Sequence, residues 1–327
     1  MPAIPEAGAT AGRMPAVPGA ATWASVWLPF AVVTLIWGGT WIVIRDQLNG
    51  VPPQWSVAYR FLLAAGAMAL WALVSGAGLR LTGRQIALAA VAGVLQFVLN
   101  FNLVYQAERF ITSGVVATVF ATLIVPNTLL ARVFLGQRVT GRFVGGAAVA
   151  ITGIAMLFIH ELRADEGGQA ATAAGIALTL GAVLAASGAN VIQATPTGRA
   201  LPLVPFLAWA MGIGAAVNAG VSLAVAGPPV WDPRPGYLLG LVYLALAASA
   251  FAFLLYYRII RVIGPGRSAY SSVLVPVIAM ALSTGFEGYR WTGLTIAGAG
   301  LVIGGLLVAL SGRARGRNKP AAGPVAD

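Results

Sequence analysis

The stretches TSGVVATVFATLIVPNTLLARVFLGQ (residues 112–137) and VIGPGRSAYSSVLVPVIAMALSTGFE (residues 262–287) are two copies of one pattern, 150 residues apart. Each is a long apolar run with a proline near its middle and a polar residue at its end. The matching pairs are Pro126 with Pro276, Gln137 with Glu287 and, upstream after a two-residue gap, Tyr105-x3-Arg109 with Tyr257-x3-Arg261. Such self-similarity indicates that the chain contains two structural repeats.

The composition around these repeats is that of a membrane protein. Of 327 residues, 59% are hydrophobic and 9% charged, whereas soluble chains carry about 25% charged residues. With no cysteine, one histidine (His160) and no acid in mid-span, no metal site is expected and no cofactor is implied. The net charge of +11 does not indicate nucleic-acid binding, because the arginines lie in short loops between apolar runs.

A hydrocarbon core about 30 Å thick needs roughly 20 apolar residues per helix. This rule predicts an all-α integral membrane protein with ten transmembrane helices. The predicted spans are 26–45, 54–75, 85–105, 112–132, 142–160, 172–193, 203–225, 237–258, 267–285 and 292–311.

The distribution of arginine predicts the orientation of the spans. If the N-terminus is cytoplasmic, fourteen of the twenty basic residues fall in inner loops and tails, and only Arg60 lies inside a span. Both termini are therefore expected in the cytoplasm. The predicted units are a disordered N-terminal tail (1–23), a first repeat (24–160), a periplasmic linker (161–171), a second repeat (172–311) and a basic C-terminal tail (312–327).

Five spans per repeat have a topological consequence. An odd number forces the second repeat to cross the membrane in the opposite sense to the first. We therefore expect two five-helix inverted repeats around a central cavity, which is an arrangement typical of alternating-access transporters.

Several short motifs resemble those of the drug/metabolite transporter superfamily. They are Trp37-Gly38, Arg60-Phe61-Leu62-Leu63-Ala64, Pro126…Phe134-Leu135-Gly136-Gln137-Arg138 and Pro276…Gly285-Phe286-Glu287. Over residues 26–311 the chain resembles the ten-helix EamA-type exporters, most of all the YddG-type exporters of aromatic and other amino acids. It departs from the family pattern at Gln137, where glutamate is usual, and at Ala186-Ser187, where the second repeat usually has a Trp-like start. The resemblance implies a multi-pass protein of the bacterial inner membrane.

Arg60 is the first candidate for substrate binding. A charge inside a span costs at least about 2.5 kcal/mol on insertion scales, so its presence there points to a function. Its guanidinium stays cationic and is suited to a substrate carboxylate. The alternative is structural: Arg60 extends to the outer surface, or pairs with an outer acid such as Asp46.

The other candidates are polar or aromatic side chains within the spans. Gln96 and Asn100 are four residues apart and so share a helix face, and lipid offers their amides no partner. Interhelical hydrogen bonding and ordinary packing are the alternatives for all of these residues. The complete predicted substrate site is Trp41, Arg60, Gln96, Asn100, Tyr105, Trp209, Ser249 and Tyr256, with Asn190 and Gln193 as weaker candidates.

Proline and glycine suggest where the helices bend. A proline in a helix removes one hydrogen bond and kinks the segment. The predicted hinges are Gly38, Gly39, Pro126, Gly264 and Pro276, with static kinks as the alternative.

These observations predict a monomeric secondary transporter that exports amino acids, chiefly aromatic and other large neutral ones. Its partners are its small-molecule substrate and the lipid bilayer. A polytopic enzyme is disfavoured, because no ATP-binding Gly-x4-Gly-Lys-Ser/Thr motif and no catalytic constellation are present. Glu108 and Glu287 are expected near the outer surface, so no titratable carboxylate is expected deep in the membrane to carry a coupling proton. Facilitated diffusion is therefore predicted. The alternative is a proton-coupled drug or metabolite exporter of the same superfamily.

Overall fold

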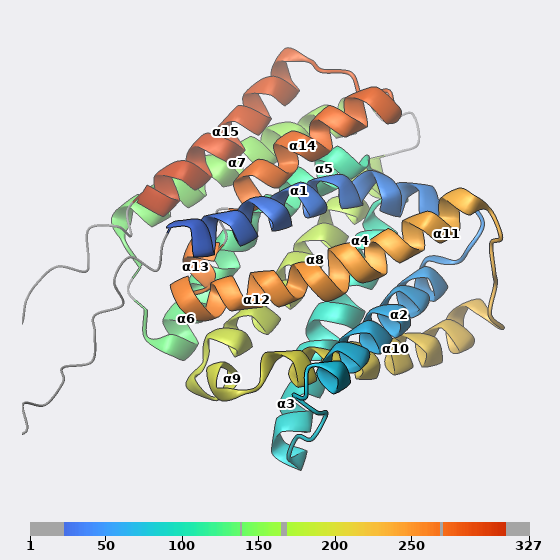
Figure 1. The fold of residues 1–327 in the computed structure, drawn as a ribbon. Helices are drawn as coiled ribbons and strands as arrows, with labels where there is room; N and C mark the ends of the chain where they lie inside the picture. The colour runs from blue at the N-terminus through green and yellow to red at the C-terminus, as the bar shows by residue number, and fades with distance from the viewer. Residues whose placement is uncertain (1–22, 138, 165–168, 269–270, 312–327) are drawn as a thin grey trace, which may run out of the picture.

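The computed structural model describes residues 23–137, 139–164, 169–268 and 271–311, all of them helical or in short connections (Figure 1). The predicted tails, apart from Trp23, and residues 165–168 of the predicted 161–171 linker lie outside these residues, whereas 161–164 belong to α7 and 169–171 to α8. The membrane-crossing segments are α1 (Trp23–Gln47), α2 (Pro53–Val74), α3–η1–α4 (Gly83–Gly93, Val94–Asn100, Phe101–Ala107), α5–η2–α6 (Ser113–Phe120, Ala121–Leu123, Ile124–Leu135), α7 (Gly141–Ala164), α8 (Gln169–Ala194), α10 (Leu203–Ala226), α11–η3–α12 (Pro235–Val242, Tyr243–Phe251, Ala252–Ile263), α13–α14 (Pro265–Ser268, Ser271–Phe286) and α15 (Gly293–Ser311).

These segments confirm the ten predicted spans to within a few residues. Seven of them are long and apolar enough to cross a membrane, and the segments 141–157, 275–286 and 293–309 are shorter apolar helices. Helices are the required solution here, because lipid cannot satisfy free backbone N–H and C=O groups. The short helix α9 (Pro196–Ala200) connects α8 to α10.

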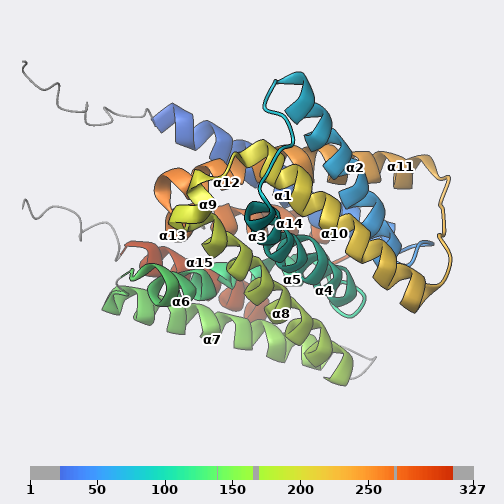
Figure 2. The same ribbon diagram turned by 90° about the horizontal axis from the view of Figure 1, so that it is seen from below.

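The packing pairs are unchanged when the two repeats are exchanged. Helix α2 packs on its counterpart α10, and α7 packs on its counterpart α15, at opposite sides of the bundle (Figures 1 and 2). Helix α8 is the counterpart of α1, α14 of α5 and α6, and α12 of α4. Accordingly α1 contacts α14 and α12, and α8 contacts α5, α6 and α4. This reciprocity is what a two-fold relation between the repeats requires.

Glycines allow α7 and α15 to approach closely. A Cβ atom on Gly146 would lie 2.3 Å from the backbone nitrogen of Ala309, and one on Gly153 would lie 2.5 Å from the carbonyl oxygen of Gly298. On α15, a Cβ on Gly305 would lie 2.5 Å from the nitrogen of Ala150. Small residues at such contacts let membrane helices pack backbone to backbone.

A departure from regular helix recurs at the same place in each repeat. The third span of each repeat contains a π-helical segment, η1 in the first and η3 in the second. Such segments are rare and are frequent at functional sites. The fourth span of the first repeat is also interrupted, by the 3₁₀ turn η2 just before Pro126.

The predicted hinge residues lie in different surroundings. Gly38 packs closely on Ile278, because a Cβ atom on Gly38 would lie 2.7 Å from Cγ2 of Ile278. A Cβ atom on Gly39 would lie 3.2 Å from the hydroxyl oxygen of Tyr243. Pro126 follows the η2 turn, whereas α14 runs through Pro276 without a break. Gly264 separates α12 from α13 with φ of +82°, a conformation suited to glycine. Bending at these residues stays a prediction.

The two ends of the bundle differ in charge. We call the end where α1, α4, α10 and α14 terminate the acidic end, since Asp46, Glu108, Asp232 and Glu287 follow or close those helices. The other end, with Arg80, Arg84, Arg142, Arg199 and Arg261, is the basic end. At the acidic end Arg234 pairs with Asp232 at 2.6 Å and donates to the carbonyl of Asn49. The hydrogen bonds from Arg234 hold the pKa of Asp232 below its usual value.

The arginine distribution predicts that the acidic end faces the periplasm, and thiol labelling tests this. Because the native chain has no cysteine, single cysteines are clean probes. Asn49 and Gly83 are both exposed, one at each end. We expect Asn49→Cys to react with a membrane-impermeant maleimide added to intact cells, and Gly83→Cys to react only after the membrane is opened. The reverse pattern would refute the orientation.

Candidate substrate-binding site

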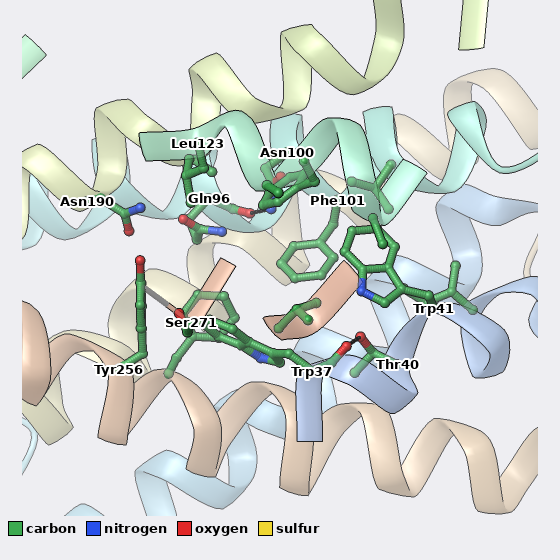
Figure 3. A pocket seen from close by; sticks show the side chains of 18 of the residues that line it. Trp37, Thr40, Trp41, Gln96, Asn100, Phe101, Leu123, Asn190, Tyr256 and Ser271 are labelled. Carbon is green, nitrogen blue, oxygen red and sulfur yellow. Dashed lines mark hydrogen bonds between the residues drawn. The ribbon is translucent and has the colours of Figure 1, made fainter. Parts of the chain in front are cut away.

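A central cavity lies between the two repeats (Figure 3). Its volume is about 90 Å³. Its lining is Trp37, Thr40, Trp41 and Ile44 of α1, Arg60 of α2, Gln96, Asn100, Phe101 and Val104 of η1 and α4, Ala117, Phe120, Ala121 and Leu123 of α5 and η2, Ala186 and Asn190 of α8, Phe253 and Tyr256 of α12, and Ser271 and Val275 of α14. Apart from Arg60, this described lining contains no charged side chain.

The π-helical segment η1 supplies two amide oxygens to the cavity. Gln96 and Asn100 are 4% and 2% exposed, and both line the cavity. The Asn100 amide nitrogen donates to the carbonyl of Gln96 at 3.3 Å, whereas Oδ1 of Asn100 and Oε1 of Gln96 accept no hydrogen bond. Two buried acceptors are thus free to bind a donor on a ligand.

Arg60 supplies a buried cation on the same cavity. Its side chain is 1% exposed, and Nε donates to the Ser249 hydroxyl at 2.9 Å. The guanidinium carbon lies 4.3 Å from the centroid of the Phe101 ring, a favourable cation–π geometry. Its Nη1 has no hydrogen-bond partner. The structural alternative proposed for Arg60 is therefore wrong: the side chain turns into the bundle and belongs to neither ion pair of the described residues.

Aromatic side chains form the walls. Trp41 meets Phe120 edge to face at 5.7 Å, and its indole nitrogen has no hydrogen-bond partner. Trp37 packs on Phe253 and Tyr256 at 5.3 and 4.8 Å and donates to the carbonyl of Ala248. In Figure 3, Trp41 and Asn100 lie toward one end of the cavity and Tyr256 and Asn190 toward the other.

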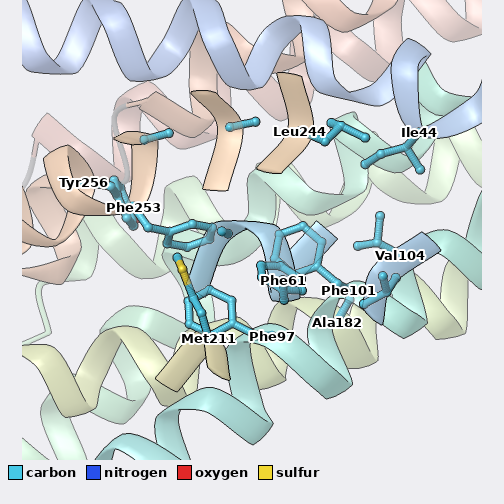
Figure 4. Close-up of a cluster of buried hydrophobic side chains, with 14 of the residues drawn as sticks. Ile44, Phe61, Phe97, Phe101, Val104, Ala182, Met211, Leu244, Phe253 and Tyr256 are labelled. Atoms are coloured by element: carbon cyan, nitrogen blue, oxygen red, sulfur yellow. The ribbon is translucent and has the colours of Figure 1, made fainter. Parts of the chain in front are cut away.

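An apolar cluster that includes the cavity residues Phe101 and Phe253 supports these walls (Figure 4). Phe61 contacts Phe97 and Phe101, each at 4.8 Å between ring centroids, and Phe97 contacts Phe253 at 5.2 Å. The cluster joins α2, η1, α4 and α12, so it connects the segments that carry Arg60 and the two amides. A rigid support of this kind holds a binding site in its geometry.

The structure brings together five of the eight residues predicted for the substrate site, namely Trp41, Arg60, Gln96, Asn100 and Tyr256. Ser249 and Tyr105 lie behind them: Ser249 holds Arg60, and the Tyr105 hydroxyl donates to Gln47 at 2.9 Å. The placement of Trp209 in the site is wrong. Its indole is 36% exposed and donates to the carbonyl of Leu79, so it anchors the connection between α2 and α3.

Sequence reasoning missed Phe120 and Phe253 in the walls. The residues next to each of them in the sequence are like those beside a phenylalanine that faces lipid. The one available signal is their position in the spans that carry the repeat pattern, since Phe120 precedes Pro126 by six residues and Phe253 precedes Tyr257 by four.

Comparison with known proteins identifies the family. A profile described as the EamA-like transporter family matches residues 23–159 and, a second time, residues 173–311. The chain belongs to the EamA-like transporter family. It is thus a membrane transporter and exporter of this family, not an enzyme, and the two matches coincide with its two repeats.

Individual relatives agree with this assignment. A probable amino-acid metabolite efflux pump of Salmonella typhimurium is 26% identical over 304 residues, covering 86% of this chain and 93% of the relative. The uncharacterized inner membrane transporter YedA of Escherichia coli K12 is 26% identical over 313 residues, covering 89% and 92%. One crystal structure, 20% identical, covers 90% of this chain and 100% of its own with a TM-score of 0.66, which shows the fold. The relatives and the apolar spans support a bacterial inner-membrane location.

Proposed function

We propose that this EamA-family transporter exports large neutral amino acids, aromatic ones included, across the bacterial inner membrane. One observation carries the proposal: five buried polar atoms of the described cavity lining lack a hydrogen-bond partner, and they include both donors and acceptors. Arg60 Nη1 and Trp41 Nε1 are donors, whereas the amide oxygens of Gln96, Asn100 and Asn190 are acceptors. A zwitterionic amino acid has the complementary set, because its carboxylate accepts and its ammonium donates.

The charge and polarity of the lining favour this substrate class. A buried cation without a counter-ion is costly, and a substrate carboxylate would supply the counter-ion for Arg60. The same cation repels cationic drugs. The rings of Trp37, Phe120 and Phe253 provide an apolar wall for a large side chain. Relatives named as a probable amino-acid metabolite efflux pump and a probable terminal-alkyne amino-acid exporter support the amino-acid assignment. Preference for aromatic amino acids, as in the YddG-type exporters, is part of the proposal.

We propose further that transport is passive and proceeds by alternating access in a monomer. The inverted repeats supply two equivalent halves around one cavity, as alternating access commonly uses. Proton-coupled carriers usually place a titratable carboxylate at the substrate site, and the described cavity lining has none. Export would then follow the outward amino-acid gradient.

Counterflow in proteoliposomes tests both the substrate and the coupling. Vesicles loaded with unlabelled amino acid are diluted into labelled amino acid at one pH, with no ion gradient. We expect transient accumulation of labelled phenylalanine, tryptophan and leucine, little of aspartate or lysine, and no effect of a protonophore. Accumulation that requires an imposed pH gradient would refute passive transport, and counterflow with cationic drugs instead of amino acids would refute the substrate class. Protein-free vesicles are the control.

A further inference from the structure

An acid at the acidic end of the bundle is buried without any partner. Glu108 directly follows the span that ends at Ala107, and its side chain is 0% exposed. Neither of its carboxylate oxygens has a hydrogen-bond partner. The sequence predicted this acid near the outer surface, and it does lie at that end. Its side chain is nevertheless buried, which its position at the end of a span did not indicate.

The neighbouring acid, Glu287, is held very differently. It follows α14 and accepts hydrogen bonds from the hydroxyl groups of Ser113, at 2.6 Å, and Ser283. The Arg45 Nε atom lies 3.7 Å from its other oxygen. Glu287 thus has hydroxyl donors and a cation beside it, whereas the oxygens of Glu108 have no hydrogen-bond partner.

These contacts lie between the two repeats at the acidic end of the bundle. Glu287 and Ser283 belong to the second repeat, and Ser113 and Arg45 belong to the first, so their bonds tie the repeats together at this end. Ala117, one turn beyond Ser113 on α5, already lines the cavity. Opening the cavity toward the acidic end therefore requires these bonds to break, and it would wet Glu108.

The charges that face Glu108 come from three helices besides its own. Burial raises the pKa of Glu108 well above its ordinary value, and the Glu287 carboxylate of α14 raises it further. The cations Arg45 of α1 and Arg60 of α2 lower it by smaller amounts. The other neighbours on its own helix and on α1, Tyr105 and Gln47, are neutral and bonded to each other. In the closed arrangement Glu108 is thus a neutral acid, since an ionised carboxylate there would have neither water nor a partner.

We propose that Glu108 is a proton-binding site whose occupation is linked to closure of the acidic end. On closing, the carboxylate takes one proton from the water at that end and forms an O–H bond. On opening, the same bond breaks and the proton returns to the same water. No proton crosses the membrane in this cycle, so the site is compatible with passive transport.

The sign of the pH dependence follows. The pKa of Glu108 is higher in the closed state than in the open, wetted state. Closure is therefore favoured as the pH at the acidic end falls, and opening is favoured as that pH rises. Between the two pKa values, one linked proton changes the ratio of open to closed protein by up to about tenfold per pH unit.

Thiol accessibility measures this equilibrium without reference to any substrate. Ala117 is 1% exposed, so in Ala117→Cys the thiol reacts with an impermeant thiosulfonate from the acidic end only when that end opens. Asn49→Cys, exposed at the same end, identifies the labelled side and corrects for the pH dependence of thiol reactivity itself. We expect the corrected rate of Ala117→Cys to rise several-fold from acid to alkaline pH.

Two further variants, made in the Ala117→Cys background, decide the assignment. Glu108→Gln carries a permanently neutral amide and should label slowly at every pH. Arg45→Gln removes a cation that lowers the pKa of Glu108, so the midpoint should move to higher pH. An unchanged pH profile in Glu108→Gln would overturn the proposal. If that variant does not fold, Arg45→Gln decides. It also removes the ion pair with Glu287, which multiplies the labelling rate by the same factor at every pH, so the midpoint is read from the logarithm of the corrected rate against pH, and an unmoved midpoint would overturn the proposal.

Discussion

Asn100→Leu is expected to abolish saturable export while leaving the protein folded in the membrane. Leucine has the same number and branching of side-chain heavy atoms but offers no acceptor to the substrate ammonium. A hydrogen bond to a charged group contributes about 1.5–3 kcal/mol, so its loss lowers affinity roughly 10- to 150-fold. The internal bond from Asn100 to the carbonyl of Gln96 is long, at 3.3 Å, and its loss should cost little stability. Initial rates of export against substrate concentration give the answer.

A neighbouring amide provides the matched control. Asn102 lies two residues along the same span and donates to the carbonyl of Val98 and to Asn218 Oδ1, both at under 3 Å. It does not line the cavity, so Asn102→Leu should lower the melting temperature in detergent and leave the Michaelis constant unchanged. Unaltered transport kinetics in Asn100→Leu would remove Asn100 from the site.

The number and limits of the spans could be predicted because they depend on apolar length alone. The duplication was equally visible, since Pro126 and Pro276 keep their offset of 150 residues. Gln96 and Asn100 were found because lipid-facing amides are costly, so two of them on one helix face must turn inward.

What the sequence could not predict depends on rotation of the helices and on burial by distant segments. The π-helical segments η1 and η3 have no recognisable sequence signal, yet they set which side chains face the cavity. Trp209 was assigned by its depth in a span, but depth does not say which face of α10 it occupies. Glu108 lies at a span end as predicted, but its burial depends on the packing of other helices, among them α8 and α2, which contact α4.

Arg60 is another residue whose surroundings could not be predicted from the sequence. Its position in the second span was compatible with an extended side chain at the membrane surface or with a substrate site. Two contacts that no local pattern contains turn the side chain into the bundle and away from the surface, the bond to Ser249 of η3 and the ring of Phe101; substrate binding by Arg60 stays a proposal. Both partners lie in the third span of a repeat, one in each copy.

Arg60→Gln is expected to erase the preference of the transporter for a free carboxylate. In the native protein an amino acid should be transported with a lower Michaelis constant than its carboxamide, because only the acid pairs with the guanidinium. Loss of that charge-assisted bond lowers the affinity for the acid roughly 10- to 150-fold, whereas affinity for the neutral carboxamide should change little. Competition of each compound against labelled amino acid in proteoliposomes measures the ratio directly.

The variant is expected to fold, because replacing a buried charge that has no counter-ion by a neutral side chain removes a desolvation cost. Arg60→Lys is the matched control: it keeps the charge but loses the planar fork, which a lysine does not reproduce. It should therefore retain part of the preference for the acid. If Arg60→Gln discriminates acid from carboxamide as well as the native protein does, Arg60 does not bind the carboxylate, and its role is confined to joining α2 to η3 through Ser249.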